Sequence, residues 1–227
     1  RQRQMCIRDS PQTRREHLAL LFDRMQMRPF VPSDVRALTG WLTPAAQTLR
    51  QADVLADMVV EELRRRRILL PARPALEAII HVAIRRGIRI AHRALAGGIS
   101  EGQKLDLDKL LDPREGTSVT ILAWARTPAL SPAAVNLDRI AERIRFLRSL
   151  NLPTTLMDRI PAKVFDEFAA EGTRMSAQHL RDLNTERRHA VLAATVLHLS
   201  RHLTDCAIDM FKKLMGCLLY TSPSPRD

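Results

Sequence analysis

The chain has 227 residues, of which 45% are hydrophobic, and its 36 lysines and arginines outnumber its 25 acidic residues to give a formal net charge of +11. A chain of this length and apolar content can bury a core, and its longest apolar runs fall well short of the roughly 20 residues that span a bilayer. The composition therefore argues against disorder and against a membrane anchor, and the excess of arginine favours a polyanionic partner over a basic protein with no nucleic-acid role.

The two ends of the chain do not fit the pattern of the rest. Residues 5–10 (MCIRDS) and 217–222 (CLLYTS) can be encoded by the two strands of one short DNA sequence, which resembles the transposon end used to attach adapters in sequencing libraries. We therefore interpret residues 1–10 and 217–227 as library-derived, not native, and leave them out of the fold prediction. The alternative is a natural basic N-terminus and a Ser/Pro tail. On our interpretation Cys206 is the one native cysteine, which fits a reducing, cytoplasmic setting.

Helix-forming residues dominate between these ends, without sustained alternation of polar and β-branched residues, so we predict an all-α, multi-helix fold with two helical subdomains. Residues 11–111 should form the N-terminal, DNA-binding subdomain. The segment 112–131 collects turn formers and loses the helical period, which predicts a linker. Residues 132–216 should form a second helical subdomain, truncated at its C-terminal end.

The helices of the first subdomain are predicted from residues that typically begin or end a helix. Ser33 resembles an N-cap for a helix that ends near residue 42, and a stronger amphipathic helix begins at Asp53. Pro74 occupies the first turn of a long helix that two glycines end after residue 96. A further helix should begin near Ser100.

Helix 132–150 opens the second subdomain, and its arginines are expected to point mostly outward and form a second basic face. These arginines are Arg139, Arg143, Arg145 and Arg148. A helix, a glycine-containing turn and another helix should follow, and then one long helix from about residue 185 to residue 216.

Four consecutive arginines, Arg64 to Arg67, are predicted to end the helix that begins at Asp53. Cations near the last carbonyls of a helix interact favourably with its dipole, by about 0.3–1 kcal/mol each, but one or two would be enough for that. Four in succession point around the helix in all directions. We therefore expect some of them to contact DNA and others to pack against the fold.

The segment 53–94 has the order helix, Pro-bounded turn, helix, which helix-turn-helix proteins use to place one helix in the major groove. Two consecutive helices also occur in most all-α proteins, so it is the position of the arginines that favours DNA binding. We predict that the arginine run contacts phosphates and that the second helix contacts base edges. The predicted DNA-binding residues of this segment are Arg64, Arg65, Arg66, Arg67, Arg85, Arg86, Arg89 and Arg93.

No set of residues in the sequence forms a recognisable catalytic or metal site. His198 and His202 are four residues apart, but neither an HExxH pattern nor a cysteine pair accompanies them. The acidic pairs 61–62 and 166–167 diverge on a helix and have basic neighbours. We predict no catalytic residue, no metal ligand and no cofactor in this chain.

Several segments resemble, in order from about residue 15 to residue 216, the N-terminal region of the large replicative transposases of the Tn-three family. They include VEELRRRRILLPA (60–72), LRSLNLP (147–153), EGTRMSAQHLRDL (171–183) and LTDCAIDMFKKLMG (203–216). The resemblance implies a helical DNA-binding part that recognises the terminal inverted repeats. It also implies that strand transfer, by an Asp-Asp-Glu site with magnesium, lies far downstream in the full-length enzyme.

The resemblance extends the predicted DNA-binding set to a second group, Arg174, Gln178, His179 and Arg181. It implies a bacterial, cytoplasmic and nucleoid-associated protein whose partner is the double-stranded DNA of transposon ends. Other transposase subunits are further candidate partners. The alternative is a helical scaffold or protein-interaction module with no sequence-specific DNA binding.

Overall fold

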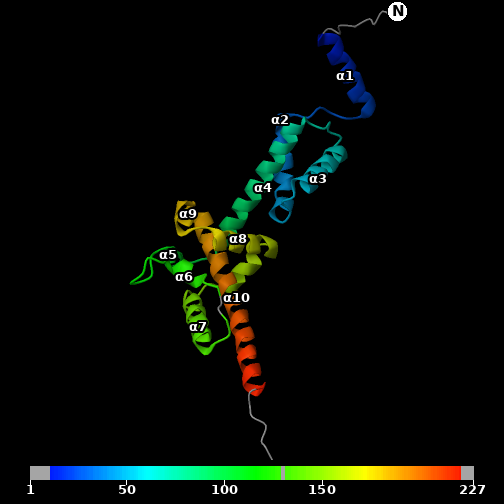
Figure 1. The fold of residues 1–227 in the computed structure, drawn as a ribbon. Helices are drawn as coiled ribbons and strands as arrows, with labels where there is room; N and C mark the ends of the chain where they lie inside the picture. Colours follow the sequence, from blue (N-terminus) through cyan, green and yellow to red (C-terminus); the bar gives the residue numbers. More distant parts are fainter. Residues whose placement is uncertain (1–10, 129–130, 221–227) are drawn as a thin grey trace, which may run out of the picture. The chain divides into compact units, whose positions relative to one another are not determined.

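The computed structural model describes residues 11–128 and 131–220, and these residues form an all-α fold, as the sequence predicts (Figure 1). The described residues contain no strand, only two isolated β-bridges, Arg28 with Ile68 and Pro113 with Thr120. The helices belong to two compact units, one ending at Gly87 and the other beginning at Ile88. Of the segments interpreted as library-derived, residues 1–10 and 221–227 lie outside the described residues.

The first unit is built from helices whose apolar residues recur every three or four positions and meet in one core. The hydrophobic residues buried in it are Leu38, Leu42, Ala46, Leu55, Val59, Leu63, Ile68, Ile79, Ile80 and Ala83. They come from α2 (Pro32–Leu42), the short η1 (Ala45–Gln47), α3 (Ala52–Arg65), the turn after α3 and the first part of α4 (Arg73–Ala96), and α1 (Pro11–Met25) precedes them.

The start of α2 differs from the sequence prediction. The helix begins at Pro32 and not after Ser33, because proline fits the first helical position and the Asp34 carboxylate accepts the Val31 N–H at 2.9 Å. Asp34 is thereby held at the edge of the core. The predicted starts near Asp53, Pro74 and Ser100 are confirmed, the last by the Ser100 hydroxyl, which accepts the backbone N–H of Gln103.

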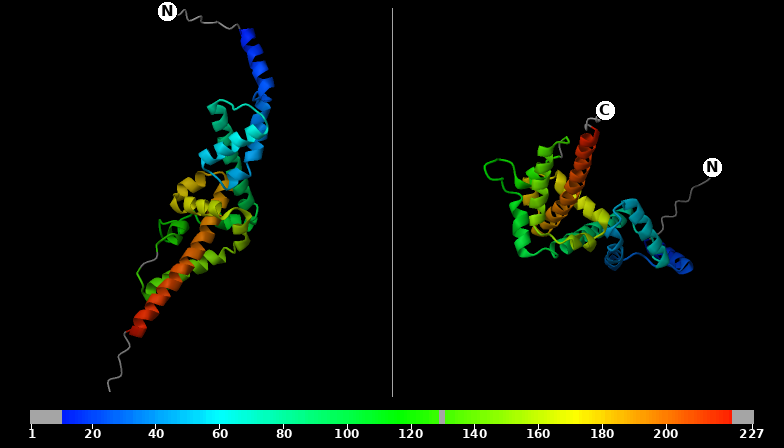
Figure 2. Two further views of the ribbon diagram at one scale, coloured as in Figure 1. Left: turned by 90° about the vertical axis from the view of Figure 1, so that its right-hand side faces the viewer. Right: turned by 90° about the horizontal axis from the view of Figure 1, so that it is seen from below.

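The second unit is organised around one long helix, α10 (Thr185–Tyr220). In the views of Figures 1 and 2, α7 (Ala134–Ser149) and α8 (Ala162–Arg174) lie along α10. Residues 189–197 of α10 are all buried, because helices pack around this stretch from several sides. The remaining elements are α5 (Glu101–Lys109), α6 (Ile121–Ala125), η2 (Thr154–Arg159) and α9 (Ala177–Asp182).

The boundary between the two units falls within α4, after Gly87, and not in the predicted linker at 112–131. Helices α5 and α6 pack into the core of the second unit, where Leu107, Leu111 and Leu122 are buried with residues of α8 and α10. The turn formers of segment 112–120 make a local loop closed by the bridge between Pro113 and Thr120. The turn signal in the sequence therefore marks a loop inside a unit.

Gly172 allows α8 to pack closely against α10. A Cβ atom at this position would lie 1.9 Å from the Thr195 Oγ1 atom and 2.9 Å from the Val191 Cγ1 atom. Thr195 is fully buried, and its hydroxyl already donates to the Val191 carbonyl at 2.7 Å. Neither side chain can move away without opening a buried contact, so only glycine fits here.

We predict that Gly172→Ala lowers the free energy of unfolding of the second unit by about 1–3 kcal/mol, because the core must shift to accept the methyl group. Chemical denaturation followed by Trp124 fluorescence in a Trp41→Phe background measures this. Gly102→Ala is the matched control, since nothing lies within 4 Å of its Cβ position in α5. Equal stability of the two alanine variants would contradict the close packing of α8 on α10.

Candidate nucleic-acid interface

Helix α3 ends on the arginine run in a Schellman motif. The Ile68 N–H donates to the Leu63 carbonyl at 2.9 Å, and the Arg67 N–H donates to the Arg64 carbonyl at 3.0 Å. Leu63 and Ile68 are both buried in the same core cluster, which supplies the hydrophobic contact that accompanies this motif. Arg67 occupies the position usually held by glycine, with a φ of 55° in the left-handed region. Helix α3 therefore ends within the arginine run.

A buried carboxylate holds two of the four arginines. Glu62 is 5% exposed, and Arg65 donates to it from Nε and Nη2 at 2.7 Å each. Arg66 adds a bond from Nε at 2.6 Å. The hydrogen bonds from Arg65 above all, and those from Arg66, lower the pKa of Glu62 to about 2 against the opposing effect of burial. Arg65 and Arg66 therefore stabilise the fold by binding the buried Glu62 carboxylate.

A second buried carboxylate, Asp34, holds Arg28, which no signal in the sequence had singled out. The Arg28 Nη1 and Nη2 atoms donate to the two Asp34 oxygens at 2.8 and 2.6 Å. This bidentate contact is the main cause that lowers the pKa of Asp34 to about 2. The backbone of Arg28 also exchanges hydrogen bonds of 2.9 Å with Arg67 and Leu69. Residues far apart in the sequence thereby place a fifth arginine beside the run.

Arg64 and Arg67 are the members of the run that no buried carboxylate holds among the described residues. The Arg64 side chain is 73% exposed, and its contact with the equally exposed Glu61 is 3.7 Å long. Arg67 donates to the Gln26 side chain at 2.5 Å, which leaves its charge uncompensated. Exposed pairs of the Arg64 kind contribute at most about 1 kcal/mol, so both guanidinium groups can turn to an external anion.

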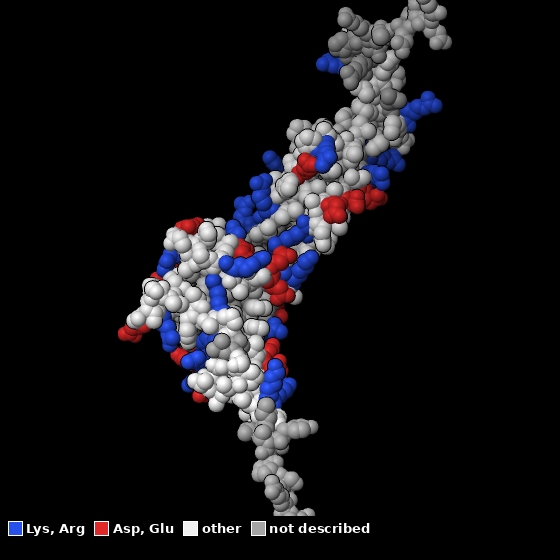
Figure 3. Space-filling model, viewed as in Figure 1, with Lys and Arg blue, Asp and Glu red and all other residues white. Residues whose placement is uncertain are grey.

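The predicted arginines of α4 are exposed. In the part of the chain that the structure describes, Arg85, Arg86 and Arg89 make no side-chain hydrogen bond or ion pair, whereas Arg93 lies 3.5 Å from Glu186. Basic side chains follow α4 in the surface view of the first unit (Figure 3). Because positions 85 and 89 are one helical turn apart, their side chains share a face about 6 Å apart along the axis.

The second predicted group belongs to the second unit and makes mostly internal contacts. Gln178 donates to Asp182 at 3.1 Å, and His179 contacts the Ser176 hydroxyl through both its backbone N–H and its ring Nδ1. Ser176 is the N-cap of α9, so His179 takes part in the helix start. Arg174 is exposed and forms no ion pair among the described residues. It is the member of this group most open to a partner.

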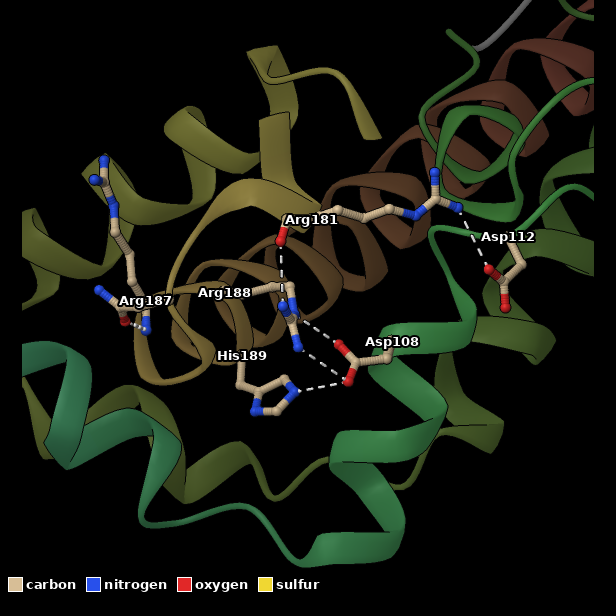
Figure 4. A network of polar contacts seen from close by, with 7 residues as sticks. Asp108, Asp112, Arg181, Arg187, Arg188 and His189 are labelled. Carbon is tan, nitrogen blue, oxygen red and sulfur yellow. Dashed lines mark hydrogen bonds and ion pairs between the residues drawn. The ribbon is translucent and has the colours of Figure 1, made fainter. Parts of the chain in front are cut away.

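Arg181, the last predicted residue, joins a polar network between α5, α9 and α10 (Figure 4). It donates to the Leu111 carbonyl and lies 3.4 Å from the Asp112 carboxylate. At the centre of the network Asp108 accepts hydrogen bonds from Arg188 at 2.9 Å and contacts the buried His189 at 3.2 Å. These contacts tie the start of α10 to α5, and they give Arg181 a place in the fold.

Two further arginines are bound by carbonyl groups. Arg126 donates to the Met175 carbonyl at 2.8 Å and to the Gly172 carbonyl at the end of α8, and burial lowers its pKa to about 10. Arg143 was expected to point outward with the other arginines of its helix, but it is 5% exposed. The Thr127 carbonyl accepts from its Nη1 atom, which draws the side chain inward.

The described residues contain no group of three or more His, Cys, Asp or Glu side chains placed to hold a metal ion. In the same residues no helix combines the length and the apolar character needed to cross a membrane.

Comparisons with known proteins give a consistent result. Residues 2–83 match a family described as a domain of unknown function (DUF4158), a range that begins inside the segment interpreted as library-derived. The chain is 33% identical over 203 residues to the transposase for transposon Tn501 of Pseudomonas aeruginosa and 33% identical over 207 residues to that for Tn3926 of Escherichia coli. It is 24% identical over 207 residues to the transposase for Tn1546 of Enterococcus faecium. These alignments cover 89–91% of the chain, which spans about a fifth (20–21%) of the length of these relatives.

The pKa of Glu62 generates a prediction for acid stability. Its pKa is about 2 in the fold against a usual 4.5, so its contribution is fully present above pH 4.5 and is lost as the pH falls toward 2. We expect the first unit to lose about 2–3 kcal/mol of stability from this group across that window. Urea titrations followed by Trp41 fluorescence in a Trp124→Phe background measure the loss. Glu62→Gln should remove the share of the loss that Glu62 contributes and leave that of Asp34, whereas the exposed control Glu61→Gln should leave the whole loss unchanged. An unchanged acid dependence in Glu62→Gln would contradict the assignment.

The left-handed conformation of Arg67 generates a second prediction. Arg67→Gly removes the backbone strain, and Arg67→Ala keeps it, while both remove the same side-chain contact with Gln26. We expect the glycine variant to unfold with a free energy about 0.5–1 kcal/mol higher than the alanine variant. The same Trp41 fluorescence titration compares them. A glycine variant no more stable than the alanine variant would show that the Schellman end of α3 does not form.

Proposed function

The chain is homologous to the N-terminal region of Tn-three family transposases, and from this premise we propose that it binds transposon DNA and recognises the terminal inverted repeats in replicative transposition. The observation that carries the proposal is the set of exposed α4 arginines, Arg85, Arg86 and Arg89, without internal partners among the described residues. A fold that neutralises Arg28, Arg65 and Arg66 internally leaves these three guanidinium groups facing solvent. Phosphate oxygens are the partners that match their charge and planar shape.

The division between held and free arginines decides which of them contact DNA in this proposal. Drawing both Arg65 and Arg66 away from Glu62 would leave a buried charge uncompensated, a change that typically costs about 3–5 kcal/mol. A phosphate therefore meets the free arginines of α4 first, and Arg64 and Arg67 add contacts at the end of α3. Arg93, in the part of α4 that belongs to the second unit, can contact a phosphate by giving up an exposed ion pair of small energy.

Sequence recognition is assigned to α4. The connection from α3 to α4 covers residues 66–72, which is longer than the turn of three or four residues in a helix-turn-helix motif. We therefore base the assignment on the surface of α4 and not on that motif. Val82 is 41% exposed on the same helix as Arg85 and Arg86, and an apolar side chain beside arginines can contact thymine methyl groups while the arginines hold the backbone.

The rest of the transposition reaction is proposed for the portion of the transposase that the alignments leave uncovered. Strand transfer with magnesium would take place there, and the chain would contribute DNA binding to a larger enzyme acting on the nucleoid in the cytoplasm. Other transposase subunits would assemble on the same DNA. The alternative, a helical scaffold with basic faces, requires acidic protein partners for the same arginines.

We predict that replacing Arg85, Arg86 and Arg89 by alanine reduces the salt dependence of DNA binding. Each arginine–phosphate interaction contributes about 0.9 to the slope of log K against log salt, so the slope should fall by about 2–3 in the triple variant. Fluorescence anisotropy with the inverted repeat that flanks the encoding gene, at several salt concentrations, measures it.

A matched control removes three basic residues that have local acidic partners, Arg73, Lys104 and Lys109. Its change in net charge is the same, and its slope should equal that of the unmodified chain. An unrelated duplex of equal length supplies the second comparison. No preference for the inverted repeat would favour the scaffold, and equal slopes for the two triple variants would contradict the role of the α4 arginines.

A further inference from the structure

A pocket of about 300 Å³ lies in the second unit between α6 and α7, and Arg114 from the loop before α6 and Thr127 and Pro128 after α6 also line it. Its walls include Arg114, Trp124, Arg139, Glu142 and Arg143. None of these residues was predicted from the sequence to bind DNA, and none takes part in the interface described above. The volume is at the lower end of small-molecule sites, so the pocket can take one compact ligand.

One wall of the pocket is a stacking platform. The Arg114 guanidinium carbon lies 4.5 Å from the centroid of the Trp124 ring, and Glu142 holds Arg114 there through an ion pair of 2.8 Å. The Phe146 ring meets Trp124 edge-on, with centroids 5.5 Å apart. Two planar groups are therefore fixed beside the pocket. Nucleobases stack on aromatic rings and on arginine planes of this kind.

The other wall carries two arginines, Arg139 and Arg143, that form no ion pair among the described residues. Arg143 is 95% buried (5% exposed), yet its hydrogen bonds go to the Thr127 and Arg139 carbonyls, and no carboxylate contacts it among the described residues. Glu142 is the neighbouring acid, and its ion pair is with Arg114. Arg139 is exposed and forms no ion pair in the described part of the chain. A buried cation bound only by neutral groups is costly, and an anion in the pocket would compensate it.

We propose that this pocket binds a single unpaired nucleotide, with the phosphate at Arg139 and Arg143 and the base against Arg114 and Trp124. An unpaired nucleotide in a DNA strand and a free nucleotide share this chemistry. If the ligand is a nucleotide within a DNA strand, the inference rests on the proposed function, since the second unit would then bind unpaired DNA. Arg143 also anchors the loop at Thr127, but anchoring explains neither the stacked platform nor the free charge of Arg139.

The test uses the tryptophan in the pocket as its reporter. The chain has two tryptophans, so Trp41→Phe leaves Trp124 as the sole indole. Saturable quenching by deoxyadenosine monophosphate is expected, and deoxyadenosine or inorganic phosphate alone should bind about tenfold more weakly because each reaches one wall. Arg139→Ala should weaken binding of the monophosphate by about tenfold. Arg145→Ala, which removes an exposed arginine from the same helix outside the pocket, should leave it unchanged.

A short single-stranded oligonucleotide and a blunt duplex complete the titration. Tighter binding of the single strand than of the monophosphate identifies DNA as the source, and binding of the monophosphate alone identifies a free nucleotide; both support the pocket. The proposal is overturned if neither the monophosphate, up to about 5 mM, nor the single strand quenches Trp124 fluorescence. It is also overturned if Arg139→Ala and Arg145→Ala bind the monophosphate with equal affinity. Absence of the pocket signal with intact preference for the inverted repeat rejects this inference alone. A pocket signal without preference for the inverted repeat rejects the proposed function alone.

Discussion

Charge compensation inside a strongly basic chain is the constraint on which the first unit depends. Asp34 and Glu62 are both buried, and between them they bind Arg28, Arg65 and Arg66 through short, partly bidentate hydrogen bonds. The Asp34–Arg28 pair joins the start of α2 to the segment before it, and the Glu62 contacts lie within the end of α3. They also sort the arginines into those that hold the fold and those that remain available, and the proposed DNA contacts follow from that sorting.

The second unit applies the same rule with different acceptors. Asp108 collects Arg188 and His189 at the start of α10, while Arg126 is bound by carbonyls at the end of α8. In both sites protein oxygen atoms accept hydrogen bonds from the cationic side chain. Arg143 lines a pocket beside Arg139, and neither arginine forms an ion pair among the described residues. An anionic ligand stabilises most an arginine that is buried, unpaired with a carboxylate and accessible from a pocket.

Local sequence signals predicted the fold class and several helix ends, because proline, glycine and capping residues act within a few positions. Pro74 and Ser100 are examples. The pairing of Arg28 with the arginine run could not be predicted, since it depends on a β-bridge between residues 28 and 68. Which of the four adjacent arginines bind a carboxylate also depends on where the side chain of one buried acid, Glu62, points. The inward turn of Arg143 has the same origin, an acceptor from another segment.

Arginine-specific chemical modification can test directly whether the exposed α4 arginines contact DNA, as we propose. Phenylglyoxal labelling read out by mass spectrometry reports each guanidinium group with and without duplex DNA. We expect Arg85, Arg86 and Arg89 to react readily in the free chain and to be protected by DNA, while Arg65 and Arg66 react slowly in both states. Protection confined to Arg65 and Arg66, with Arg85, Arg86 and Arg89 still reactive on DNA, would contradict this proposal.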